Sequence, residues 1–307
     1  MKKSEISPIK FSSISEAHKA FGLSEPLHPL ITIFDGSQEQ HISRPQGTHV
    51  LHFYKISYKP ELSGKVKYGQ GYYDFNEGGL LFAAPNQIVG GVEPGELADA
   101  CSLYTMLIHP DFFWNYPLAK KIKQYGFFSY AANETLHLSA SEKATIISIF
   151  QMIETELKSR IDDFSQDVVI SQIELLLNFA NRFYKRQFIT RKAASGDLLQ
   201  KLEVLLDDYF DNEKTVTNGL PTVQYLSEHL NITPSYLSDM LRSLIGHNAQ
   251  QHIHIKLIEK AKELLSTTTL SVSQVAFQLG FEHSQSFNKL FKKKTNISPL
   301  EFRQAFN

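Results

Sequence analysis

Two short stretches near the C-terminus of this 307-residue chain combine hydrogen-bonding side chains with cations at the spacing of one helix face. Such groups can hydrogen-bond base edges in a DNA groove or contact phosphate oxygens. By helix position we assign base reading to Ser235, Ser238, Asp239, Gln285, Asn288 and Lys289, and phosphate contact to Arg242, Lys292 and Lys293. A solvated surface is the better explanation of any one of these residues, whereas DNA contact is the better explanation of the set.

An internal near-repeat supplies the elements that would position these side chains. Residues 223–232 recur as 272–281 at an offset of about 49, and residues 237–241 recur as 287–291 at about 50. Each copy has apolar residues at helical spacing, then a turn, then a second apolar stripe. This pattern predicts two short packed helices, a helix-turn-helix unit, in each copy.

Capping signals agree with this division. Thr233 followed by Pro234 suits the start of the second helix in the first copy. Ser271 with Gln274 has capping-box spacing and opens the first helix of the second copy. Residues 250–266 lack Pro and Gly and predict a connecting helix with an apolar underside. We expect it to space the two recognition helices by about one DNA turn, ~34 Å, so that one chain reads two successive major grooves.

Bulk properties bound the class of protein. The length suits two domains, and 42% hydrophobic residues can build real cores. A single cysteine, Cys101, fits a reducing compartment, and neither a signal peptide nor a membrane span is apparent. We therefore expect a cytoplasmic protein. The net charge of -1 is uninformative, but from Pro221 onward nine Lys and Arg residues stand against six Asp and Glu residues.

Residues 1–140 read mostly as strands. The candidates are residues 28–34, 49–57, 66–75, 79–89 and 102–109, rich in aliphatic and aromatic residues and separated by Gly, Pro, Asn and Asp. Short strands at this spacing with no helices between them predict an antiparallel sandwich or barrel.

Helices follow in residues 141–189. Ser139 with Glu142 has capping-box spacing, and a second helix spans 165–185. Five of its apolar residues form a coiled-coil seam: Val169, Ile173, Leu176, Ala180 and Phe183. The seam favours a homodimer through this helix. The alternative is that the helix covers the sheet, because further apolar residues widen the face.

Residues 190–196 are small and polar and are the expected interdomain linker. After them, residues 198–209 form one more amphipathic helix, and residues 211–219 are expected to be a polar loop. The second domain therefore covers 197–307.

The last third resembles the DNA-binding domain of the AraC/XylS family of transcription regulators. The matching residues are 270–276, Leu279-Gly280-Phe281, Phe287, 290–293, Ile297-Ser298-Pro299 and Phe302-Arg303. The sequence departs from the family at Asp239, where Arg or Lys is frequent, and at His283, Gln285, Ser286 and Asn296. A carboxylate at 239 cannot contact phosphate but can accept a hydrogen bond from cytosine. These departures bear on the target sequence and not on the fold.

For the whole chain, the resemblance implies an α+β fold. Residues 1–140 would form an antiparallel, cupin-like effector-binding barrel, residues 141–189 a helical dimerisation segment, and 197–307 an all-α domain of two helix-turn-helix units joined by a long helix. The implied function is a sequence-specific transcription regulator controlled by a small-molecule effector. Its partners would be double-stranded DNA and, for an activator, RNA polymerase. Aromatic residues could line an effector pocket, although such residues are more often plain core: Phe53, Tyr72, Phe82 and Tyr104.

Cupin-type folds also house metal enzymes, so the alternative is a cupin-like binding or metal-dependent catalytic protein whose helical tail has another purpose. His49 and His52 are three apart and would point to opposite faces of a strand. His252 and His254 diverge on a helix. Nucleophile-elbow and phosphate-loop motifs are absent from the sequence. We therefore expect no catalytic activity, no metal and no cofactor.

Overall fold

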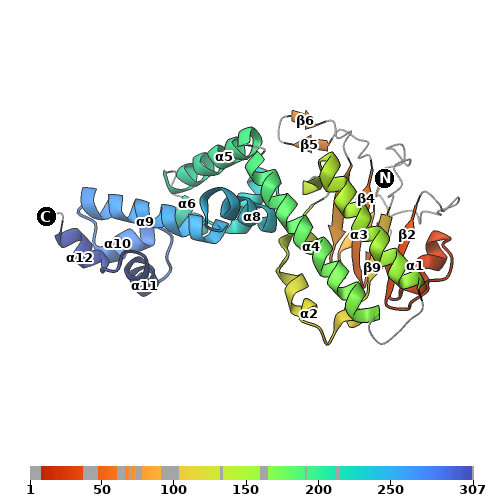
Figure 1. Cartoon of the computed structure of the whole chain (residues 1–307). Coiled ribbons are helices and arrows are strands. Elements are labelled where there is room, and N and C mark those ends of the chain that lie inside the picture. The colour runs from red at the N-terminus through yellow and green to blue at the C-terminus, as the bar shows by residue number, and fades with distance from the viewer. Residues whose placement is uncertain are drawn as a thin grey trace, which may run out of the picture. The chain divides into compact units, whose positions relative to one another are not determined.

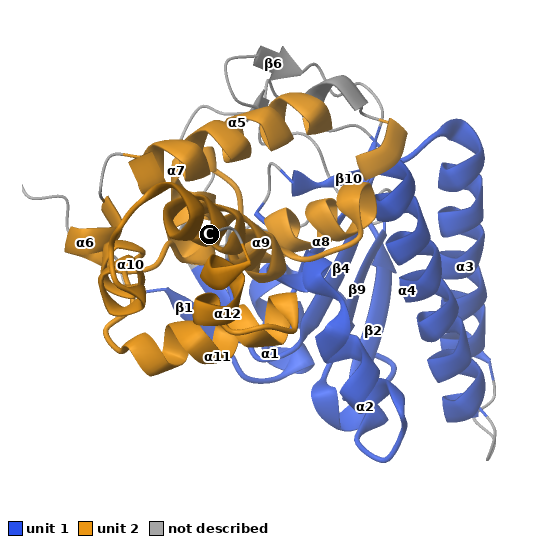
Figure 2. Cartoon of the chain, turned by 90° about the vertical axis from the view of Figure 1, so that its left-hand side faces the viewer, with its two compact units in different colours: residues 1–187 blue, residues 188–307 orange. Residues whose placement is uncertain are grey.

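A computed structural model describes residues 8–36, 48–60, 66–68, 71–73, 78–90, 104–131, 134–159, 165–190, 192–211 and 214–305. The chain divides into two compact units, Met1–Gln187 and Phe188–Asn307 (Figure 2). The division falls inside helix α4 (Ser165–Thr190), near the boundary predicted from the sequence. Among the described residues, no helix is long and apolar enough to cross a membrane.

The first unit is built on an antiparallel sheet with helices around it, as Figure 1 shows. Its five strands lie in the order β10 (Leu136–His137), β7 (Gly79–Ala83), β4 (Tyr54–Lys59), β9 (Tyr104–Ile108) and β2 (Ile31–Asp35). A second sheet has the order β1 (Ile9–Phe11), β3 (Thr48–Leu51) and β8 (Ile88–Gly90), with β1 parallel to β3. Strands β5 (Val66–Tyr68) and β6 (Gly71–Tyr73) form a ribbon. Each predicted strand segment overlaps at least one of these strands.

The prediction of a closed barrel is wrong, because the described strands form open sheets. Helices supply the apolar partner for the main sheet, so its strands need not close on themselves. On one face, Tyr104 of β9 stacks on Phe150 of α3 (Ala140–Lys158), with ring centroids 5.4 Å apart. The other face carries Leu107, which joins a core with Phe53 and residues of α1 (Ile14–Phe21). The sequence analysis did not predict α1.

The seam on α4 faces the core of its own unit. All five predicted seam residues, from Val169 to Phe183, are buried, at most 7% exposed. The helix therefore covers the sheet, which was the alternative to a dimer seam. The apolar residues that α4 leaves exposed are Val168 and Leu175 in the same stretch, and Ile189 further on.

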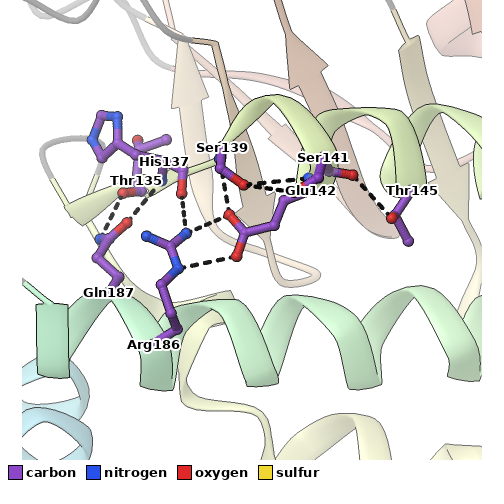
Figure 3. Close-up of polar contacts among 8 residues, drawn as sticks. All are labelled: Thr135, His137, Ser139, Ser141, Glu142, Thr145, Arg186 and Gln187. Atoms are coloured by element: carbon purple, nitrogen blue, oxygen red, sulfur yellow. Dashed lines mark hydrogen bonds and ion pairs between the residues drawn. The ribbon is translucent and has the colours of Figure 1, made fainter.

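A polar network fixes the last turns of α4 to the start of α3 and to β10, as Figure 3 shows. Arg186 donates to both carboxylate oxygens of Glu142, at 3.0 and 2.6 Å, and to the carbonyl oxygen of His137 at 2.8 Å. The same carboxylate accepts from the backbone N–H of Ser139, which confirms the predicted capping box. Gln187 accepts from the backbone N–H of His137 at 2.8 Å. Paired in this way, the Arg186 guanidinium holds α4 in register with the sheet.

The same unit contains several short helical turns. They are η1 (Pro110–Phe113), α2 (Leu118–Lys121), η2 (Ile122–Gln124) and η3 (Gly126–Ser129). Aromatic residues of η3 pack against Phe82 and Tyr184, which closes the sheet face beside α4.

The second unit is helical. Its elements are α5 (Lys192–Asp211), α6 (Lys214–Asn218), α7 (Val223–Leu230), α8 (Pro234–Ile245), α9 (Ala249–Thr267), α10 (Val272–Gln278), α11 (Ser284–Thr295) and α12 (Pro299–Gln304). The two predicted helix pairs, α7–α8 and α10–α11, and the connecting helix α9 are confirmed. Two predicted loops are corrected. Residues 192–196 of the expected linker open α5, where the Ser195 hydroxyl donates to the carbonyl oxygen of Phe188. Residues 214–218 of the expected loop form α6.

Candidate nucleic-acid interface

The first helix-turn-helix unit is α7 and α8 with the turn between them. Asn231 ends α7 in the left-handed conformation, with φ of 55°. The Thr233 hydroxyl then accepts from the backbone N–H of Tyr236, and Pro234 occupies the first turn of α8. These contacts satisfy backbone groups that a helix terminus leaves without partners. The turn predicted from the sequence is confirmed.

The second helix-turn-helix unit, α10 and α11, has different residues at its turn. Ser271 and Gln274 form the predicted capping box of α10. Gly280 has φ of 89°, and a Cβ atom there would lie 2.8 Å from the backbone of Gly219 and 2.9 Å from that of Thr215. His283 precedes α11 and makes no side-chain capping hydrogen bond. Gly280 therefore lies against the backbone of residues 215 and 219, and α11 lacks the side-chain cap that α8 has.

Buried apolar residues anchor each recognition helix, α8 or α11, within its helix-turn-helix unit. Leu237 and Leu241 of α8 and Phe287 and Phe291 of α11 are fully buried. Tyr236 of α8 is 5% exposed, and its ring packs edge-on against Phe188 at 5.1 Å. Tyr236 is therefore part of the core and not of the outward face of α8.

Helix α9 joins the two helix-turn-helix units. It has 19 residues, which corresponds to roughly 28 Å of helix. Its N-cap residue Asn248 forms a capping box with Gln251, and its buried face includes Ile253, Leu257 and Ala261. The expected spacing of the recognition helices by about one DNA turn stays a prediction.

On α8, the structure brings two predicted site residues together. The Arg242 guanidinium donates to the Asp239 carboxylate at 2.6 Å. Ser235 and Ser238 lie half-buried on the same helix. The sequence analysis assigned Asp239 and Arg242 separate roles and missed their ion pair. The signal was their spacing of three residues, which places side chains next to each other on a helix.

On α11, the predicted site residues are all exposed. They are Gln285, Asn288, Lys289, Lys292 and Lys293. Within the part of the chain that the structure describes, Lys289, Lys292, Lys293 and the adjacent Lys294 form no ion pair. The helix therefore presents four lysines without an ion-pair partner among the described residues, beside two amides, an arrangement suited to a polyanion.

Carboxylates of α5 form ion pairs with lysines of α9. Lys256 and Lys260 of α9 pair with Glu203 at 2.6 Å and Asp211 at 2.9 Å. Buried His252 lies 2.9 Å from the same Glu203 carboxylate and 3.0 Å from His247. Burial lowers the pKa of His252 below 6.5, and the approach of Glu203 opposes that shift only in part. This cluster joins α5 to α9.

His49 and His52 do not form a metal site together. His49 is buried between the rings of Phe11 and Phe21, and burial lowers its pKa. His52 lies in the turn between β3 and β4. Among the described residues, no group of three or more His, Cys, Asp or Glu side chains is placed to hold a metal ion. Cys101 lies outside the described residues.

Three of the four predicted pocket residues are packed against protein. Phe53 belongs to the core under α1, Tyr104 stacks on α3, and Phe82 contacts η3 and α4. The side chain of Tyr72 lies outside the described residues. These contacts divide the set between two faces of the sheet, so a shared effector pocket stays a prediction.

Comparisons with known proteins find matches to the helical C-terminal part of the chain. A family described as "Helix-turn-helix domain" matches residues 226–305, which include α8 and α11. The arabinose operon regulatory protein of Salmonella typhimurium is 32% identical over 99 residues, 32% of this chain and 31% of that protein. The xylose operon regulatory protein of Escherichia coli K12 is 31% identical over 83 residues, 27% of this chain and 21% of that protein. The chain thus spans less than a third of either relative.

Solved structures are similar to about a third of the chain. The C-terminal domain of the response regulator yesN from Fusobacterium nucleatum is 35% identical, with 33% of this chain and 96% of that one covered and a TM-score of 0.29. The DNA-binding domain of AdpA, solved with a target DNA, is 22% identical, with 34% and 91% covered and a TM-score of 0.29. Residues 226–305 are therefore similar to a helix-turn-helix family and to regulators of the arabinose and xylose operons.

Proposed function

We propose that the chain is a sequence-specific DNA-binding transcription regulator. The observation that carries this proposal is the pair of recognition helices α8 and α11, each anchored by buried apolar residues and each presenting polar side chains outward. In helix-turn-helix proteins, the second helix of each unit lies in the major groove with its N-terminal residues at base edges. The names of the arabinose and xylose operon regulators are consistent with this function.

The proposed roles follow from position along the recognition helices. Ser235, Ser238 and Asp239 near the start of α8 would read bases, as would Gln285, Asn288 and Lys289 on α11. Further along α11, Lys292 and Lys293 would contact phosphate oxygens, which positions the protein without reading sequence.

A gel-shift series with the full-length protein tests these roles. Gln285→Ala and Lys289→Ala should change the preferred sequence, whereas Lys292→Ala should weaken binding to every sequence alike. Loss of the Lys292 charge should also flatten the dependence of log K on log salt by about 0.9. The assignment is rejected if all three variants behave identically.

We further propose that the first unit senses a small molecule, because the sequence of that unit resembles the family's effector domain. A metabolite panel in a thermal-shift assay tests this: a ligand at 100 times its Kd stabilises the folded state by ~2.7 kcal/mol. A panel without any shift would contradict effector control and leave DNA binding untouched. RNA polymerase would be a further partner if the chain activates transcription, and function on chromosomal DNA implies a cytoplasmic location.

A homodimer through α4 remains part of the proposal, although on a different face from the predicted seam. Exposed Val168 and Leu175 flank Ser171 and Gln172 in a shallow surface groove of this helix. An isologous dimer would cover both apolar side chains at once. Sedimentation of Leu175→Asp against wild type tests this face: a dimer that persists in the variant rules it out.

A further inference from the structure

The two recognition helices differ in formal charge. Helix α11 carries four lysines and no carboxylate, whereas α8 carries one cation, Arg242, and one carboxylate, Asp239. On α8 these two charges are joined at 2.6 Å. On α11 all four ammonium groups are exposed, and none is paired within the described ranges. Only α11 therefore offers a concentrated positive surface.

This difference predicts different contributions to DNA binding. Each free cation that neutralises a phosphate releases a counterion and adds to affinity for any sequence. Arg242 is already compensated by Asp239, so its contact with a phosphate would add less to affinity than the contact of a free cation. Asp239 itself is repelled by phosphate.

Base edges can use both partners of the ion pair. Guanine presents two acceptors, O6 and N7, that suit an arginine, and cytosine presents an N4 amino group that suits a carboxylate. Because Asp239 and Arg242 lie three residues apart, they are neighbours on the helix face that carries Ser235 and Ser238. The pair is therefore chemically complementary to one G·C base pair.

Resting on the proposed function, we propose that the two helix-turn-helix units have different roles in DNA recognition. The second helix-turn-helix unit provides the sequence-independent hold on the phosphate backbone through Lys292, Lys293 and Lys294, in addition to the base reading by Gln285, Asn288 and Lys289. The first helix-turn-helix unit contributes discrimination without such a hold, with Asp239 orienting Arg242 toward a G·C pair. This replaces the phosphate role that the sequence analysis assigned to Arg242.

The test uses the full-length protein on a duplex selected from a random library, with a random duplex for comparison and a salt titration for each. Asp239→Asn removes the carboxylate charge with little change in shape. It should tighten binding to random DNA and steepen the salt slope, the dependence of log K on log salt, by about 0.9. It should also reduce the ratio of the Kd for random DNA to the Kd for the selected duplex by about 10-fold. Arg242→Gln should reduce the same ratio and leave the salt slope unchanged.

The complementary variant is Lys292→Ala combined with Lys293→Ala. It should flatten the salt slope by about 1.8 and weaken both duplexes by the same factor. Lys201→Ala on α5 is the control, because Lys201 is an exposed lysine already paired with Asp197 and should change neither quantity. Thermal melts identify any variant that is not folded, and Arg242→Gln tests the ion pair independently of Asp239→Asn.

The outcomes separate this inference from the proposed function. If wild type binds its selected site but Asp239→Asn and Arg242→Gln keep the wild-type ratio of random to specific Kd, the division of roles is wrong and the regulator proposal stands. It is equally wrong if the lysine variant changes sequence preference at constant salt slope. If wild type prefers no duplex at all, the proposed function itself fails.

Discussion

The two helix-turn-helix units have buried apolar residues at equivalent positions but differ in the charge of their surfaces and in the residues of their turns. Leu237 and Phe287 occupy equivalent buried positions, 0% exposed in both units. In contrast, the first turn has Asn231 at φ of 55°, and the second has Gly280 at φ of 89° against a neighbouring backbone. The first recognition helix is capped by Thr233 and is formally neutral, whereas the second lacks a side-chain cap and carries four lysines. Similar packing thus supports two different surface chemistries.

The largest difference should appear at the turns. Gly280→Ala places a Cβ within 3 Å of two backbone atoms and puts a non-glycine residue at positive φ. Strain and overpacking together should lower the free energy of unfolding by about 2–5 kcal/mol. Asn231→Ala meets only the strain and should cost about 1 kcal/mol. Urea unfolding of both variants measures this, and equal losses would show that the two turns are equivalent.

Much of the second unit could be predicted from its sequence, because apolar spacing, caps and turn residues are local signals. The repeat and the capping box at Ser271 were both visible there. Burial of Tyr236 was not, because it depends on Phe188, 48 positions earlier in the chain. Likewise, the burial of the α4 seam and the open sheet depend on which face each helix covers, and apolar periodicity does not specify the partner.

The N-caps allow a paired test of intermediate size. His283→Ser would supply the missing cap of α11 and should raise the free energy of unfolding by about 1 kcal/mol. Thr233→Ala removes the existing cap of α8 and should lower it by a similar amount. Chemical denaturation gives both values. A loss of stability in His283→Ser would mean that His283 has a structural role that the comparison of caps overlooks.

The smallest effect expected is a pH dependence centred on α5 and α9, of which α9 packs against the first recognition helix. Burial holds the pKa of His252 below its ordinary value of 6.5. The unfolded chain therefore binds a proton more readily than the folded one in this range, and stability present above pH 6.5 is lost as the pH falls toward the folded pKa. Glu203, His247 and Lys256 surround this ring.

His252→Gln removes this titrating group, so unfolding measured between pH 7.5 and about 5 should lose stability less steeply in the variant than in wild type. Some slope should remain, because burial also lowers the pKa of His28, His49 and His254. A variant with the full wild-type slope would show that the His252 cluster does not couple the fold to pH.

The central claim is that two recognition helices of one chain bind neighbouring major grooves of a duplex. Competition binding of the full-length protein tests it most directly, with a library-selected duplex against random DNA at moderate ionic strength. The account predicts a selected site with two conserved blocks whose centres lie about 10–10.5 base pairs apart, and a preference of at least 10³-fold over random DNA. Binding with no preference over random competitor, or a single block that persists when either recognition helix is altered, would contradict it.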